Sequence, residues 1–144
     1  MLQILLPELV KAEMLGSMGL FDGLRWPELE EAGAQFEEIA FPRGGRLTIQ
    51  GRHDSSISLL VSGDALVSAD ARPLRVIGHG DAVGLVSMLY RIKSPETTIA
   101  LTPVRALMAG PEQFGALLRQ ATIRRRLTAM AADRMRSRKP FRGR

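Results

Sequence analysis

The chain has 144 residues, of which 45% are hydrophobic and 24% are charged, and its formal net charge is +5. This length and composition suit one soluble globular domain with a buried core and exclude a disordered chain. The absence of cysteine excludes disulfides, thiolate metal sites and a cysteine nucleophile, and it suits a reducing cytoplasm. The apolar start, residues 1–7, lacks a basic region and is soon followed by charges, so we expect neither a signal peptide nor a membrane span.

Two helices are predicted before residue 37. Residues 2–14 carry apolar side chains at spacings of three and four. A second helix begins near Trp26, where Pro27 suits the first helical position and the glutamates that follow favour the positive end of the helix dipole. A short apolar segment at residues 17–21 and a turn at Asp22-Gly23 separate the two helices.

Short β runs, many of them separated by glycine turns, follow these helices. They predict a sandwich or barrel and not a parallel βαβ sheet. Pro111, directly after Gly110, suits the start of a helix over residues 111–121, and a long basic helix is expected over residues 123–138. The predicted strands are 37–42, 46–50, 57–61, 65–67, 73–77, 97–101 and 104–108.

A glycine turn interrupts the β runs at Gly80–Thr98. Gly80-Asp81 and Gly84 lead directly into a short apolar helix, Leu85–Tyr90. Free backbone N–H groups at the start of a helix can hold an anion. Such turns are common, and most of them hold no ligand.

This order of elements resembles the cyclic nucleotide-binding domain family, which includes catabolite activator-like regulators, the regulatory subunit of protein kinase A and cyclic-nucleotide-gated channels. The resemblance implies a mainly β (α+β) fold: an antiparallel jelly-roll barrel with N-terminal helices and two C-terminal helices. It divides the domain, 1–138, into helices (2–36), barrel (37–110) and C-terminal helices (111–138), with a basic tail at 139–144. The matching motifs are Leu20-Phe21-Asp22-Gly23-Leu24, Gly45-x-Leu47-x-Ile49-Gln50-Gly51, Leu59–Val67 and Gly80-Asp81-Ala82-Val83-Gly84.

Two positions depart from the family pattern. Ligand-binding members have Glu after the cassette glycine to hold the ribose, and this chain has Leu85. About ten residues later those members have an Arg after a proline to pair with the cyclic phosphate, and this chain has Glu96. Burying an unpaired phosphate costs several kcal/mol or more, a helix end returns only about 0.3–1 kcal/mol when exposed, and Glu96 would repel the anion.

Two interpretations of the cassette therefore remain. In the favoured one, Leu85, Val86, Met88 and Leu89 pack against the sheet and fill the pocket, and Arg91 and Lys93 are solvated loop cations. In the alternative, Arg91 or Lys93 rescues binding of a cyclic nucleotide (cAMP or cGMP) or another small anion. The ligand-binding residues would then be Gly84, Leu85, Val86, Ser87, Arg91, Lys93, Thr97 and Thr98.

The C-terminal segment also has two interpretations. Residues 119–144 contain ten Arg and Lys and one acid, a net charge of +9, and the rest of the chain carries −4. This asymmetry indicates an interaction tail, which can contact nucleic acid non-specifically or an anionic membrane. The last helix also has an apolar stripe, which would form a homodimer, dock on a protein partner, or fold back on its own barrel. The predicted interaction residues are Ile123, Leu127, Met130 and Arg134.

Little in the sequence indicates catalysis. His53 and His79 lie in turns without a carboxylate cluster, so we expect no metal site, and no P-loop, Rossmann or GxSxG motif occurs. Too few residues follow the last helix for a helix-turn-helix domain, so we expect no sequence-specific DNA binding. We therefore predict a cytoplasmic, non-enzymatic regulatory or interaction module that needs no cofactor and has lost nucleotide binding. The alternative is a cyclic-nucleotide or small-anion sensor.

Overall fold

The computed structural model describes residues 2–136 and the side chains of residues 9–136. The predicted tail 139–144 and the last two residues of the predicted final helix lie outside the described residues. The helices are α1 (Leu2–Gly16), the 3-10 turn η1 (Gly19–Phe21), α2 (Trp26–Gly33), α3 (Leu85–Tyr90), α4 (Pro111–Leu118) and α5 (Ala121–Arg136). The strands are β1 (Glu37–Phe41), β2 (Arg46–Thr48), β3 (Ile57–Ser62), β4 (Ala65–Ala69), β5 (Arg72–Ile77), β6 (Ala82–Val83), β7 (Thr97–Ala100) and β8 (Val104–Ala109).

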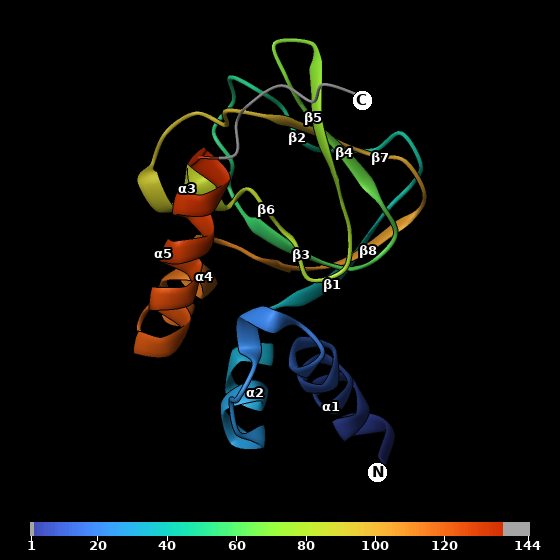
Figure 1. The fold of residues 1–144 in the computed structure, drawn as a ribbon. Helices are drawn as coiled ribbons and strands as arrows, with labels where there is room; N and C mark the ends of the chain where they lie inside the picture. The colour runs from blue at the N-terminus through green and yellow to red at the C-terminus, as the bar shows by residue number, and fades with distance from the viewer. Residues whose placement is uncertain (1, 137–144) are drawn as a thin grey trace.

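The described strands form two antiparallel four-stranded sheets, ordered β1-β8-β3-β6 and β2-β7-β4-β5. The sheets face each other as a barrel, and the helices at both ends of the chain gather beside the β1-β8-β3-β6 sheet (Figure 1). This arrangement confirms the predicted antiparallel barrel with flanking helices. The same end of the molecule thus receives the first and the last helices of the described chain.

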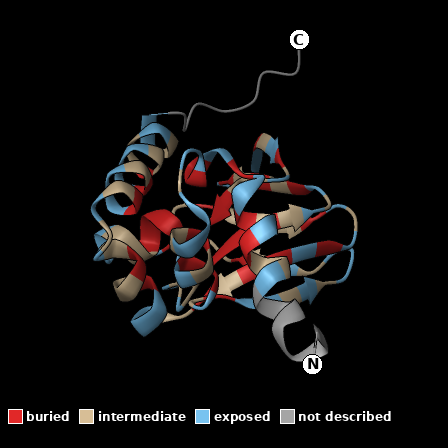
Figure 2. Cartoon of the chain, turned by 90° about the horizontal axis from the view of Figure 1, so that it is seen from below, coloured by how far each residue is buried: buried red, intermediate tan, exposed pale blue. Residues whose placement is uncertain are grey.

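Strand β3 is buried on both faces. Ile57 and Leu59 belong to a core shared with the helices, whereas Leu60 belongs to a second core inside the barrel. All three side chains are 0% exposed, and Ser58 between them is also buried, which explains why Leu59 and Leu60 are apolar at adjacent positions and do not alternate with exposed polar residues. Figure 2 shows the buried segments where the helices meet the barrel.

Many element boundaries differ from the prediction by one to three residues, including at least one end of each predicted strand. The first helix continues to Gly16, past the predicted end at residue 14. Strand β6 was not predicted, because two residues are too few to show a β period. Helix α4 ends at Leu118, and α5 begins at Ala121, two residues before its predicted start.

His79 joins the N-terminal helical segment to the barrel. Its Nδ1 lies 2.8 Å from the carbonyl oxygen of Val61, and its Nε2 lies 3.2 Å from the carbonyl oxygen of Ser17. Both ring nitrogens can donate only when the imidazole is protonated. The carbonyl acceptors at Val61 and Ser17 therefore raise the pKa of His79.

This geometry predicts a pH-dependent contribution of His79 to stability. Because its pKa is raised in the folded state, the contribution is complete below the ordinary value of about 6.5 and is lost as pH rises through the folded pKa. In urea unfolding at about pH 5.5 and about pH 8.5, His79→Gln should lower the free energy of unfolding more at the acidic pH, by less than about 1 kcal/mol because the ring is exposed. The exposed His53→Gln is the control, and an equal pH effect in both variants would contradict the assignment.

Candidate functional site

The glycine turn of the sequence forms a tightly constrained cassette. Gly84 has φ +84°, and a Cβ added there would lie 2.5 Å from the carbonyl oxygen of Ser56. Only glycine combines this left-handed conformation with so close a backbone approach. Helix α3 starts directly after it and ends at Arg91, which is also left-handed at φ +56°. The cassette helix is thus a short piece with fixed ends.

Hydroxyl groups hold the cassette against the neighbouring loops. Ser87 Oγ accepts a hydrogen bond from the backbone N–H of Asp54 at 3.1 Å and donates to the carbonyl oxygen of Ile92 at 2.6 Å. Ser94 and Thr48 both donate to the carbonyl oxygen of Glu96, at 2.8 and 3.0 Å. The backbone at Glu96 is therefore fixed from two sides.

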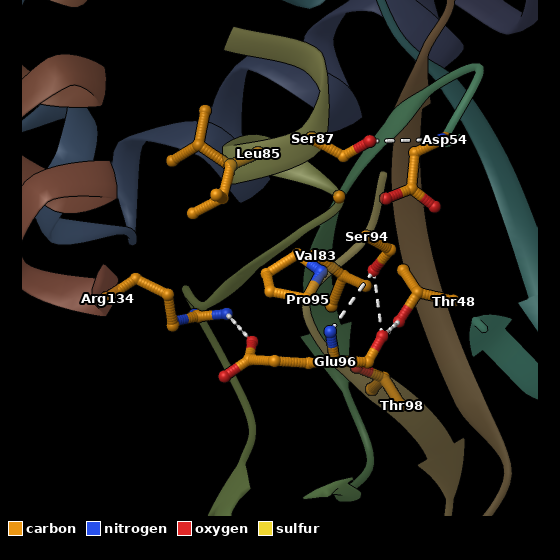
Figure 3. A pocket seen from close by; sticks show the side chains of 12 residues that line it. Thr48, Asp54, Val83, Leu85, Ser87, Ser94, Pro95, Glu96, Thr98 and Arg134 are labelled. Carbon is orange, nitrogen blue, oxygen red and sulfur yellow. Dashed lines mark hydrogen bonds and ion pairs between the residues drawn. The ribbon is translucent and has the colours of Figure 1, made fainter. Parts of the chain in front are cut away.

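The Glu96 carboxylate lies between two arginines and is almost buried, with 7% of its side chain exposed. Arg75 of β5 donates from Nη2 to both carboxylate oxygens at 2.8 Å. Arg134 of α5 lies 3.7 Å from Glu96 Oε1 and donates to the carbonyl oxygen of Ala82 at 3.0 Å. We call Arg75, Glu96 and Arg134 the charge cluster, and Figure 3 shows the Glu96 and Arg134 side chains pointing toward each other.

Burial is the main reason why the pKa of Arg134 is lowered, and the nearby charge of Arg75 lowers it further. The carboxylate of Glu96 opposes both effects. Two buried guanidinium groups without an anion between them would repel each other in a medium of low dielectric constant. Glu96 is thus the counterion that allows β5 and α5 to bring their arginines together.

The cavity beside the charge cluster is very small. Its volume is about 20 Å³, and its lining includes Thr48, Leu85, Thr98 and Arg134. A water molecule needs a cavity of at least about 10–15 Å³, whereas small-molecule pockets measure about 300–1,000 Å³. The cassette in this structure has room for about one water.

The predicted ligand residues separate into two groups. Those at the small cavity are Gly84, Leu85, Val86, Ser87 and Thr98, and Leu85 and Val86 are also part of the helix-facing core. Thr97 accepts a hydrogen bond from the backbone N–H of Gln50. Arg91 and Lys93 are exposed and do not line the small cavity. The structure therefore does not bring the two proposed rescuing cations to the place where a phosphate would lie.

Met88 and Leu89 pack against the same core cluster as Leu85 and Val86 but do not line the small cavity. They line a separate, larger groove together with Arg91. Leu85 and Val86 line the small cavity and not this groove, so the two hollows take different residues of α3.

Asp54 forms part of the wall between the small cavity and this groove. One of its carboxylate oxygens, Oδ2, is buried and has no hydrogen-bond partner among the described residues. Burial raises the pKa of Asp54, and hydrogen bonds with Ser87 and Ser94 partly oppose the rise. Figure 3 shows its carboxyl group on the same side as Ser94.

The apolar stripe of α5 packs on its own chain. Ile123 and Leu127 are 0% and 1% exposed within the helix-facing core, and Met130 packs against that core from its edge. Arg126 donates to the carbonyl oxygens of Leu20 and Asp22, at 3.0 and 2.6 Å. Ile123 and Leu127 are thus not available at the surface of this chain, and Arg134, the other end of the predicted interaction stripe, is paired with Glu96. Partner contact through this helix stays a prediction.

Two functional residues had no assigned role at this site in the sequence-based prediction. Arg75 gives no local signal, because one charged residue in a half-exposed strand is unremarkable. Arg134 does give one: it follows Ile123, Leu127 and Ala131 at positions +11, +7 and +3, which places it on their buried face. A charge on a buried helix face needs a partner.

The charge cluster predicts a large stability effect at Glu96. Glu96→Gln removes the anion between two partly buried arginines, so we expect the free energy of unfolding to fall by about 2–4 kcal/mol. The matched control is Glu38→Gln, which removes an exposed carboxylate paired with Arg105 and should cost at most about 1 kcal/mol. Urea unfolding of the three proteins at neutral pH measures both effects. If Glu96→Gln lowered the free energy of unfolding no more than Glu38→Gln does, the buried pairing of Glu96 would contribute no more than an exposed ion pair, and the prediction would be wrong.

Comparisons with known proteins agree with this architecture. A search of curated protein sequences finds no match. Among solved structures, the catabolite activator protein of Thermus thermophilus is 26% identical with a TM-score of 0.73, covering 81% of this chain and 58% of that one. A cAMP-binding acyltransferase from Mycobacterium smegmatis is 25% identical with a TM-score of 0.70, covering 92% and 42%.

The regulatory subunit of a cAMP-independent protein kinase A from Trypanosoma brucei is 16% identical with a TM-score of 0.80, and the match covers 89% of this chain and 47% of that one. This chain thus spans less than two thirds of the length of each of these three proteins. No helix within residues 2–136 is both long and apolar enough to span a membrane. The family model for the cyclic nucleotide-binding domain matches residues 38–121, which is more than half of the sequence, and the chain therefore belongs to the cyclic nucleotide-binding domain family.

Proposed function

We propose that this chain is a non-enzymatic regulatory module that does not bind a cyclic nucleotide in its cassette and acts through protein–protein contacts. The observation that carries the proposal is the Glu96 carboxylate held between Arg75 and Arg134. Glu96 stands where the family resemblance places the arginine that pairs with the cyclic phosphate. The module thus carries its own anion in this part of the cassette.

The negative charge of Glu96 is the first obstacle to binding of a cyclic phosphate. A cyclic phosphate that approached Arg75 and Arg134 would meet the Glu96 carboxylate at the same guanidinium groups. Displacing Glu96 would leave a buried carboxylate without its partners, which costs several kcal/mol. Because Glu96 is part of the same chain, it also competes at a high effective concentration.

The small volume of the cavity is a second obstacle to nucleotide binding, independent of the charge. The 20 Å³ cavity would have to grow more than tenfold to reach the usual size of a ligand pocket. Leu85 and Arg134 line it, and Leu85 is 4% exposed within the helix-facing core. Opening the pocket would therefore break packing between the cassette and the helices.

The fold is compatible with regulation that does not use cAMP. The Trypanosoma brucei protein of this fold is described as cAMP-independent, although at 16% identity the likeness concerns the fold alone. The Mycobacterium smegmatis protein is described as a cAMP-binding acyltransferase, so the same domain also occurs within a larger protein that has an enzymatic activity. We propose a regulatory role for this domain, and its partner remains to be found by experiment.

The proposal predicts that cAMP and cGMP do not bind. Isothermal titration of the protein with each nucleotide up to about 1 mM should give no saturable heat, and the melting temperature should not change, because a ligand that binds only the folded state raises it. Non-cyclic AMP is the control for weak, non-specific effects. The variant Arg72→Gln, at an exposed position of β5, is a control for surface charge.

Saturable binding with a concentration-dependent rise in melting temperature would overturn the proposal and favour the sensor alternative. Arg91→Asn and Lys93→Gln would then test whether these cations contact the phosphate. Asn is chosen at Arg91 because it tolerates the left-handed conformation found there. Loss of binding in Arg134→Gln, with no change in these two variants, would instead place the anion at the charge cluster.

A further inference from the structure

A second hollow lies between α3 and α4. Its volume is about 520 Å³, within the range of small-molecule pockets. Met88 and Leu89 of α3 and Phe114 and Leu118 of α4 line it. We call it the α3–α4 groove. It is some 25 times larger than the cavity at the charge cluster.

Basic residues border this groove. Arg91 and His53 line it, and the exposed Arg52, Lys93 and Arg119 are within two residues of lining residues in the sequence. Within residues 9–136, none of these five side chains makes a hydrogen bond or ion pair. These cations therefore contrast with Arg75, Arg126 and Arg134, whose guanidinium groups are all engaged inside the protein.

Two acids stand against these cations. Glu112 is exposed in the first turn of α4. Asp54 lines the groove, but its carboxyl group lies on the Ser94 side (Figure 3), and its Oδ2 is buried from solvent. Of the basic residues, Arg91 and His53 line the groove itself, and Asp54 is the acid among the lining residues. Because Arg91 has no partner within residues 9–136 and the Asp54 carboxyl group faces Ser94, the guanidinium of Arg91 is the charge that the groove offers to an anion.

We propose that the α3–α4 groove binds a small amphipathic carboxylate, whose apolar chain lies on Met88, Leu89, Phe114 and Leu118 and whose carboxylate pairs with Arg91. The apolar floor provides burial of hydrocarbon, and the guanidinium fixes the orientation of the charged end. A ligand without the carboxylate would leave Arg91 unpaired, and a cationic ligand would be repelled. The site goes beyond the proposed function and does not depend on an empty or a filled cassette.

Gly115 allows the groove to be filled without disturbing the fold. It lies in α4, it lines the groove, and a Cβ added there meets nothing within 4 Å. Leucine has a higher helix propensity than glycine, so Gly115→Leu should fold at least as well as the parent protein. Gly115→Ala is the matched control, because it gives the same gain in propensity with only one added methyl group.

The test uses sodium octanoate as the probe, with octylammonium and 1-octanol at the same concentrations as charge controls. Titration followed by ¹H–¹⁵N NMR should give saturable shifts at residues 88–91 and 114–118, with a dissociation constant in the millimolar range or tighter for about ten non-hydrogen atoms. Gly115→Leu and Arg91→Asn should each weaken octanoate binding about tenfold or more, whereas Gly115→Ala and Arg72→Gln should change it by less than about threefold.

Three results would overturn the proposal: no saturable shifts, equal binding of octylammonium, or unchanged octanoate affinity in a folded Gly115→Leu protein. Shifts that centre on Ser94, Thr98 and Arg134 would also overturn it, because they would place the probe in the cassette. That last result would count against the closed cassette of the proposed function as well. A failure at the groove alone would leave the cyclic nucleotide titration unaffected, so the two proposals fail in distinguishable ways.

Discussion

A buried carboxylate needs cationic partners, and in this protein the partners of Glu96 come from a strand and a helix that are far apart in the sequence. Arg75 lies in β5, and Arg134 lies near the end of α5. Their positions tie the barrel, the cassette loop and the last helix to one point. Removing Glu96 would leave two partly buried cations without their counterion, so the docking of α5 depends on a residue in the loop before β7. The core contacts of Ile123 and Leu127 hold the other end of the same helix.

The two departures from the family pattern act on different terms of the binding free energy. Glu96 changes the charge, because it occupies the guanidinium groups that an anion would need. Leu85 changes the volume and the polarity, because it replaces a hydrogen-bonding side chain with a buried apolar one. Either change alone weakens binding, but a reworked site could compensate for a single one. In the proposed function, Glu96 removes the counterion and Leu85 removes the room for the ligand, whereas Arg91 and Lys93 are exposed and do not line the small cavity.

Local patterns in the sequence predict most of this fold, whereas the pairing in the site is not local. Glycine turns and short β runs are enough for the barrel, and Pro27 and Pro111 mark two helix starts. The two-residue strand β6 carries no periodic signal. The sequence shows that Glu96 departs from the family pattern, but its partners are 21 and 38 residues away in the sequence. Only the fold brings Arg75 and Arg134 together, although the position of Arg134 on a buried helix face already requires a counterion.

Helix α3 contributes to two hollows. Its first residues, Leu85 and Val86, belong to the core and line the small cavity, and its later residues, Met88 and Leu89, pack against that core and line the α3–α4 groove. The cations differ between the two places: Arg134 at the small cavity is paired with Glu96, whereas the exposed Arg91 at the groove has no partner within residues 9–136. The groove therefore combines an unpaired cation with apolar side chains. Because Asp54 and Ser87 contribute to both walls, an event in the groove has a direct physical route to the cassette.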